Sequence, residues 1–225
     1  MERKYRSLTL FFVVILLLAP LGFQRYLMKL GGGVKQSWIV HSHAVCMTVW
    51  CLLLIAQPIL VKVRKHKIHR AIGRFSYFFF PVLVWSIIGV MSYSYIRLVD
   101  VLDQVQRQAM LFVPFTQMIL FTLFFGLALI YKKSPRLHMR YVICSSVALL
   151  GPTIGRIDFG FLNHINMDLW VMDICLLGFW VYDRVTDGWP KPFLYGLLGF
   201  ASVHVMNEFV PLTEEWGALV VLFFD

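Results

Sequence analysis

Histidine and carboxylate side chains lie within or beside apolar stretches of this chain, and they are the groups best suited to chemistry. Those that stand out by type and depth are His43, Asp173, His204 and Glu208. Imidazole nitrogens and carboxylate oxygens are ligands that zinc and other divalent metal ions take in proteins. His204 and Glu208 are four residues apart and share one face of an expected helix. The pattern therefore predicts a metal site formed by these residues.

A heme site is an alternative use of the same histidines. A transmembrane cytochrome with two hemes needs one pair of axial histidines near each face of the membrane. His43 and His204 form one candidate pair, and His69 and His138, each next to a basic turn, form the other. This alternative predicts heme b as the cofactor in place of a divalent metal ion. Loop or core histidines without a ligand are the third alternative, and the spacing does not decide among the three.

A polar stripe marks one face of the expected helix that carries His43. Trp50 and Gln57 follow His43 at intervals of seven residues, so all three lie on one side of a helix. Arg156 follows a later apolar stretch at a depth close to that of Asp173, and the two could form an ion pair. We expect Trp50, Gln57 and Arg156 to line a polar pocket in the outer half of the molecule, centred on His43.

The elements that must position these residues are seven apolar stretches. The chain has 225 residues, of which 59% are hydrophobic and 15% charged, and its mean hydropathy is +0.72. About 20 apolar residues cross the hydrocarbon core of a bilayer as a helix. The sequence therefore predicts an all-α membrane protein, a bundle of seven transmembrane helices in a single domain over residues 1–225. The expected helices cover residues 8–23, 38–61, 75–95, 110–131, 141–154, 169–181 and 193–211.

The distribution of charge gives the expected orientation. With the N-terminus in the cytoplasm, 15 of the 21 Lys and Arg residues fall on the cytoplasmic side and 9 of the 12 acidic residues on the other. Cytoplasmic loops are enriched in Lys and Arg in this way, so the C-terminus is expected to be extracytoplasmic. The positive charge predicts contact with anionic lipid at the basic loop from Lys62 to Arg74, and no nucleic-acid partner.

Other features exclude or weaken particular protein classes. The four cysteines all lie in apolar stretches without a Cys-x-x-Cys spacing, which is typical of core packing. A retinal protein needs a lysine in its last helix, and residues 193–211 contain none. Seven-helix metal hydrolases of the ceramidase and progestin-receptor-like group carry a late His-x-x-x-His pair, and here Glu208 takes the place of the second histidine. That class is weakened but not excluded, because glutamate also binds zinc.

Three segments between residues 41 and 200 share features with a known group of proteins. They are HAVCMTVWCLLLIAQPILVKVRKHKIHRAIGRFSY, PRLHMRYVICSSVALLGPTIGRI and YDRVTDGWPKP, and the first contains an expected cytoplasmic turn of the form Leu/Ile-His-Arg-x-x-Gly. With these segments the chain resembles a family of uncharacterised bacterial multi-pass membrane proteins. The resemblance implies a location in the bacterial cytoplasmic (inner) membrane, but no activity. The matching positions are His43, Trp50, Gln57, His69, Arg70, Gly73, His138, Arg156, Asp173 and Asp183.

Two classes of function stay open on the sequence. In the first, the protein is redox-active or metal-dependent and holds a divalent ion or heme b at the named histidines. In the second, it is a non-enzymatic small transporter, assembly factor or lipid-binding scaffold, with the polar residues lining a pocket between helices. A homo-oligomer or a membrane-protein partner fits both classes, and the sequence does not decide whether the protein is an enzyme.

Overall fold

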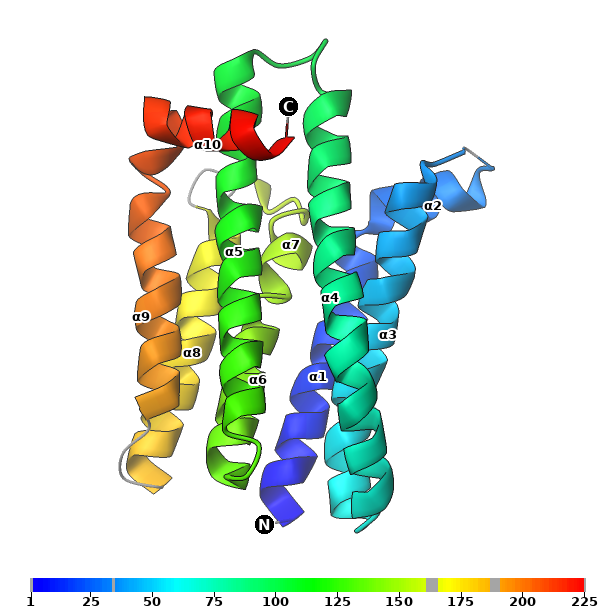
Figure 1. Ribbon diagram of the computed structural model, residues 1–225, viewed down its shortest axis with the longest axis vertical. Coiled ribbons are helices and arrows are strands. Elements are labelled where there is room, and N and C mark those ends of the chain that lie inside the picture. The colour runs from blue at the N-terminus through cyan, green and yellow to red at the C-terminus, as the bar shows by residue number, and fades with distance from the viewer. Residues whose placement is uncertain (1, 34, 161–165, 187–190, 225) are drawn as a thin grey trace. The chain divides into compact units, whose positions relative to one another are not determined.

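The structure, a computed structural model, describes residues 2–33, 35–160, 166–186 and 191–224. Every regular element within these ranges is a helix, in agreement with the all-α prediction (Figure 1). The chain forms two compact units, Met1–Tyr93 and Ser94–Asp225. In chain order the elements are α1 (Glu2–Gly22), α2 (Gln24–Gly31), α3 (Trp38–Lys62), α4 (His66–Arg97), α5 (Gln104–Ile130), α6 (Pro135–Val147), α7 (Leu150–Ile154), α8 (Met167–Thr186), α9 (Lys191–Met206), the 3-10 helix η2 (Val210–Leu212) and α10 (Glu214–Phe224).

Several helices are long and apolar enough to cross a membrane. Among the described residues these are α3, α4, α5 and the stretch Pro135–Ile154, and the count rises to five if α1 and α2 form one bent span. Large apolar side chains also face outward, with Phe78 78% and Trp85 76% exposed on α4. A soluble monomer rarely exposes so much apolar surface. These features are those of a helical membrane protein.

The last two expected spans correspond to α8 and α9. These helices are not among those that are long and apolar enough to cross a membrane. Helix α8 carries four charged side chains, and α9 is 16 residues long. Shorter and more polar segments can cross a bilayer that is locally thinned. Seven spans and the orientation of the two termini therefore stay predictions.

In the first unit, α1 packs along α3, and α3 contacts α4 through side chains. The hydroxyl of Ser37 accepts a hydrogen bond from the Ile39 N–H and caps the start of α3, as serine commonly does at this position. Trp50 of α3 is buried and its ring contacts that of Phe80 on α4, with 5.4 Å between the ring centroids. Trp50 is thus a packing residue of this unit.

Two predicted loops of the first unit are largely helical. Residues 24–37 were expected to form an outer loop, but α2 covers Gln24–Gly31 at an angle of 60° to α1. The glycines that follow end this helix, and Gly33 takes the positive φ of +72° that glycine adopts without steric cost. The basic loop from Lys62 to Arg74 is a short turn around Arg64, and α4 begins at His66.

The second unit is a helical bundle in which α5, α6, α8 and α9 lie side by side (Figure 1). Its core includes a stack of aromatic rings, with Phe124 of α5 parallel to both Tyr141 and Phe200. Helix α9 approaches α6 closely at Gly196, where a Cβ atom would lie 2.9 Å from the Cys144 sulfur. A side chain at this position would have no room without movement of the buried cysteine.

The fifth expected span, residues 141–154, is divided between α6 and α7. Pro152 has no N–H to donate to a helical hydrogen bond. The hydroxyls of Ser145 and Ser146 both donate to the Val142 carbonyl, which is a local alternative to the helical ladder. Helix α7 ends at Ile154, where the expected span ends, and Arg156 lies two residues beyond it.

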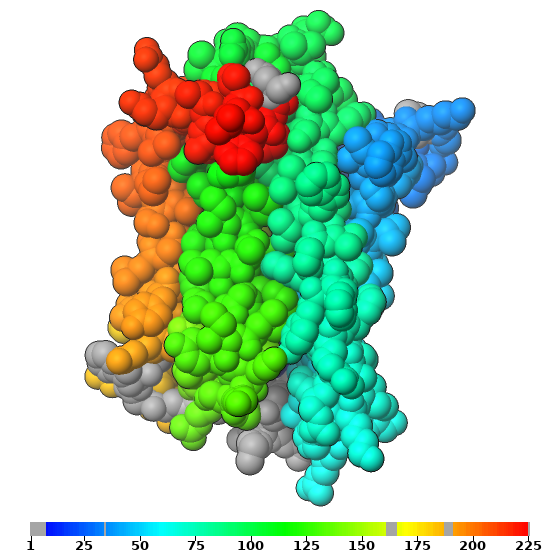
Figure 2. Space-filling view, in the orientation of Figure 1, coloured from blue at the N-terminus to red at the C-terminus, as the bar shows by residue number. Residues whose placement is uncertain are grey.

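The apolar C-terminal segment forms α10, which packs against the beginning of α5. The Trp216 indole N–H donates to the Gln108 carbonyl at 2.8 Å, and the Trp216 ring contacts Phe112 and Phe115. Phe224 contacts Tyr95 at the end of α4. The space-filling view shows the side chains of α10, in red, covering part of α5 (Figure 2). With 11 residues, α10 is too short to cross a membrane as a helix.

Candidate functional site

Helices α8 and α9 bring two ionisable side chains of the second unit into direct contact. Nδ1 of His204 lies 2.8 Å from Oδ2 of Asp173, which is a hydrogen bond and an ion pair when the imidazole is protonated. The two helices pack along each other, and Asp173 near the start of α8 meets His204 near the end of α9. We call these two residues the carboxylate–imidazole pair.

The pair is largely removed from solvent. The side chain of His204 is 17% exposed and that of Asp173 is 15% exposed. Met172 and Val203, the neighbours of the pair along each helix, are buried apolar residues. Oδ1 of Asp173 is buried and has no hydrogen-bond partner among the described residues. A buried carboxylate oxygen without a partner costs free energy, so this atom is available to a proton, a water molecule or a cation.

An indole ring orients the imidazole. Trp170 lies one helical turn before Asp173 on α8, and its ring meets His204 edge to face, with 4.7 Å between the centroids. Residues three apart share a helix face, so the indole and the carboxylate both point toward α9. Contact with both side chains leaves the His204 ring little freedom to rotate. In the described part of the chain, its Nε2 atom has no hydrogen-bond partner.

Asp168 of α8 interacts with polar groups from two other helices, Gln117 of α5 and His204 of α9. The amide of Gln117 on α5 is buried against Gly151 of α7, where a Cβ atom would approach it to 2.4 Å. Asp168, which precedes the expected span 169–181, lies against Gly155. Burial raises the pKa of Asp168 above its ordinary value, while backbone N–H groups, His204 and Gln117 act in the opposite direction. Asp168, Gln117 and His204 therefore belong to one electrostatic environment.

The expected pair between Arg156 and Asp173 is wrong. The ion pair of Asp173 is with His204, and Arg156 is exposed beyond the end of α7, where its guanidinium donates to the Pro152 carbonyl. The expectation used only the depth of each residue along its span. Depth does not say which way a side chain points, and here Asp173 points to His204 of α9.

Glu208 does not share a helix face with His204. Helix α9 ends at Met206, and the Glu208 N–H bonds to the Val205 carbonyl three residues earlier rather than four. Its side chain is exposed. In the described ranges of the chain, no three His, Cys, Asp or Glu side chains gather as a group that could hold a metal ion. Within the second unit, Asp173 and His204 are therefore in contact while Glu208 is exposed. A metal site that also includes His43 of the first unit stays a prediction.

On α3, the side chains of the expected polar stripe take part in helix packing rather than line a single pocket. Nδ1 of His43 lies 3.1 Å from the Ser86 hydroxyl on α4, and that hydroxyl donates to the Leu83 carbonyl, so His43 is the donor. Gln57 is 14 residues further along α3, a rise of about 21 Å. His43 and Gln57, at the two ends of the stripe, are therefore too far apart to line one outer pocket. His43 belongs to the first unit and the carboxylate–imidazole pair to the second, so convergence of the two stays a prediction.

The histidines proposed for the second heme also lie in different units. His138, near the start of α6, donates from Nδ1 to the Ala128 carbonyl at the end of α5, at 2.8 Å. This hydrogen bond ties the turn between the two helices. His69 lies in the first turn of α4, in the first unit. Heme ligation by these residues stays a prediction.

A buried ion pair at the opposite end of the bundle was not expected. The Arg140 guanidinium on α6 binds the Asp183 carboxylate on α8 through two hydrogen bonds, one of them 2.9 Å between Nη2 and Oδ1. Both side chains are more than nine-tenths buried. The order of the expected spans could have indicated this pair, because the fifth span starts and the sixth span ends at the same side of the membrane. This pair joins α6 to α8 and holds in place the helix that carries Asp173.

Comparison with known proteins gives no further assignment of the site. The chain matches no protein-family model, and neither a curated protein nor a solved structure shows significant similarity to it. The resemblance to the uncharacterised bacterial family stays a prediction, and the function must be argued from the geometry.

Proposed function

We propose that this protein is a non-enzymatic membrane transporter that carries protons, with the Asp173–His204 pair as its proton-binding site. The observation that supports this most is the contact of the two side chains between apolar helices, with one carboxylate oxygen lacking a partner. Ionisable groups within a membrane bundle commonly belong to proton or ion pathways. This choice corresponds to the small-transporter alternative among the sequence-based hypotheses.

The charge of the pair explains why a proton is the ligand. With a neutral imidazole that donates from Nδ1 to the carboxylate, the pair carries one negative charge and Nε2 can accept a proton. Uptake of one proton at Nε2 makes the pair an imidazolium–carboxylate ion pair with no net charge. A neutral pair is less costly in an apolar environment than a single charge, so binding and release of a proton switch the pair between two states of different solvation.

The proposed topology places this pair at the extracytoplasmic end of the bundle. In this proposal the chain crosses the bacterial inner membrane seven times, with a cytoplasmic N-terminus. Asp173 lies near the start of α8 and His204 near the end of α9, the ends that would face outward. The Arg140–Asp183 pair would then mark the cytoplasmic end of the second unit. In the first unit, the basic turn around Arg64 would contact anionic lipid on the cytoplasmic side.

A proteoliposome assay tests the function. Purified protein is reconstituted in vesicles that enclose a pH-sensitive dye, and a potassium diffusion potential drives proton entry. With the unmodified protein, we expect the dye to report acidification of the vesicle interior. The rate of acidification should fall about tenfold or more for Asp173→Asn and His204→Gln, because each variant removes a charge-carrying member of the pair. Ser202→Ala, an exposed position on the same turn of α9, is the matched control.

Two outcomes would contradict the proposal. A rate for the unmodified protein equal to that of empty vesicles removes the transport activity. Rates for the two pair variants equal to that of Ser202→Ala remove the site while leaving transport intact. A separate result would favour the metal-dependent alternative, in which His204 is a ligand. It is inhibition by added zinc that occurs in the unmodified protein and in neither of the two pair variants.

A further inference from the structure

Helix α2 in the first unit has the composition of a helix that lies in a membrane interface. Arg25 and Lys29 are four residues apart and lie on one side, while Leu27 and Leu30 are exposed apolar side chains on another. A short helix with one cationic and one apolar side binds at the boundary between lipid headgroups and acyl chains. The bend of 60° after α1 turns α2 away from the direction of the preceding span.

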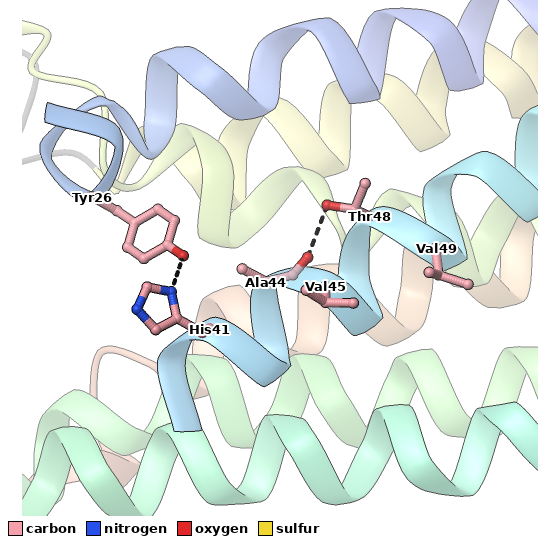
Figure 3. A pocket seen from close by; sticks show the side chains of 6 residues that line it. All are labelled: Tyr26, His41, Ala44, Val45, Thr48 and Val49. Carbon is pink, nitrogen blue, oxygen red and sulfur yellow. Dashed lines mark hydrogen bonds between the residues drawn. The ribbon is translucent and has the colours of Figure 1, made fainter. Parts of the chain in front are cut away.

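A cavity of about 260 Å³ lies between α2 and α3, far along the chain from the carboxylate–imidazole pair. Figure 3 shows its lining, in which the Tyr26 ring of α2 faces His41 at the beginning of α3. The remaining walls come from one face of α3, and Val45 there is 62% exposed, so the cavity opens toward the surroundings. The lining residues are Tyr26, His41, Ala44, Val45, Thr48 and Val49.

One end of this cavity is polar and the other is apolar. The Tyr26 hydroxyl lies 2.7 Å from Nδ1 of His41, as the dashed line in Figure 3 shows. When the hydroxyl donates this hydrogen bond, the imidazole carries its hydrogen on Nε2, and that N–H has no partner among the described residues. Further along α3, Ala44, Val45 and Val49 give an apolar track, and the hydroxyl of Thr48 among them donates to the Ala44 carbonyl.

The surrounding residues place this cavity at the level of lipid headgroups. Trp38 lies one turn before His41 and is 75% exposed, and exposed tryptophan is enriched at membrane–water interfaces. Arg25 and Lys29 lie one and three residues from Tyr26 on α2, so the helix that carries Tyr26 is positively charged. No acidic residue occurs between Glu2 and Asp100 in the sequence, so no carboxylate of these helices neutralises that charge.

We propose that this cavity binds one anionic phospholipid. The phosphate contacts Arg25, Lys29 and Nε2 of His41, and one acyl chain lies along the apolar track of α3. Charge complementarity selects an anionic headgroup, because a zwitterionic lipid brings its own cation to the same place. This site is separate from the basic turn after α3, and it does not depend on proton transport by the second unit.

Native mass spectrometry of the delipidated full-length protein tests the site, with palmitoyl-oleoyl phosphatidylglycerol compared with the corresponding phosphatidylcholine. We expect one tightly bound phosphatidylglycerol per chain, with an affinity about tenfold higher than that of phosphatidylcholine, or about 1.4 kcal/mol. Val45→Trp fills the cavity and should abolish this preference. Val82→Trp, at an exposed valine of α4 that does not line the cavity, is the matched control.

Further variants separate the headgroup from the acyl chain. Replacing Arg25 and Lys29 together by Gln should weaken phosphatidylglycerol binding about tenfold and leave phosphatidylcholine binding unchanged. Circular dichroism and size-exclusion profiles check that each variant is folded. Equal affinity for the two lipids, or equal binding by Val45→Trp and Val82→Trp, would overturn the proposal. Displacement of the lipid by inorganic phosphate alone would also overturn it, because the acyl chain would then contribute nothing.

Discussion

The two carboxylate oxygens of Asp173 have different surroundings. Oδ2 accepts a hydrogen bond from His204, and Oδ1 is buried without a partner in the described residues. A structural ion pair is most stable when all its lone pairs are satisfied, as the two hydrogen bonds between Arg140 and Asp183 illustrate. Asp173 is less completely hydrogen-bonded than Asp183, and this difference supports the proposal that the carboxylate–imidazole pair binds a proton.

A double-mutant cycle measures the coupling within the pair. Asp173→Asn and His204→Gln should each lower the free energy of unfolding, and the double variant should lose less than the sum. We expect a coupling of about 1 kcal/mol, within the range for directly bonded side chains. The same cycle with Arg156→Gln in place of the His204 variant is the control. Additive losses for the first cycle, or equal coupling in both, would reject the pairing.

Asp168 should make stability depend on pH. Its raised pKa means that the folded protein binds this proton more readily than the unfolded chain, so stability falls as pH rises above the ordinary value of 3.8. Asp168→Asn cannot ionise and should therefore melt at a higher temperature than the unmodified protein at pH 7. The difference should shrink as the pH is lowered toward 4. Thermal unfolding in detergent measures both, and a lower melting temperature for the variant at pH 7 would be inconsistent with this explanation.

At the scale of elements, the packing of α9 against α6 sets the position of His204. Gly196→Ala would place a Cβ atom 2.9 Å from the Cys144 sulfur and 3.3 Å from a methyl group of Leu176. Both neighbours are fully buried, so we expect a loss of about 1–3 kcal/mol in the free energy of unfolding, as for other overpacked cores.

Gly178→Ala in α8 provides the matched control for this packing prediction. An added Cβ atom there meets nothing within 4 Å. Alanine is a better helix former than glycine by up to about 1 kcal/mol, so this variant should be as stable as the unmodified protein or more stable. Thermal or denaturant unfolding of both variants makes the comparison. Similar losses for the two would mean that α9 does not approach α6 in the way described.

The long apolar helices could be predicted from the sequence because their length and hydropathy depend on local composition alone. Helix α2 was missed because it is short, and glycines follow it closely. The division of the fifth span into α6 and α7 was missed because the apolar stretch continues through Pro152. Depth along a span can be read from the sequence, and it placed His204 and Asp173 at the same level. Which side chains meet depends on how each helix is rotated, and only the structure provides that.

For the whole molecule, the proposed topology makes a direct prediction. Single cysteines at Lys35 and Arg107 should react with an impermeant maleimide in intact cells, because both positions fall on the expected outer side. Cysteines at Lys65 and Arg136 should react only after permeabilisation. All four positions carry charge in or near turns between helices, and the enrichment of Lys and Arg on the inner side motivates the assignment. The reverse labelling pattern would invert the orientation, and with it the side of the membrane that the carboxylate–imidazole pair faces.

The central claim is that Asp173 and His204 bind a proton as one unit. Infrared difference spectra of the reconstituted protein between about pH 8 and about pH 5, the range in which histidines titrate, measure this directly. Proton binding by the pair should shift a carboxylate band with pH. That band should be absent in Asp173→Asn and should no longer respond to pH in His204→Gln. A carboxylate band that is unchanged across this range in the unmodified protein, or that changes equally in His204→Gln, would contradict it.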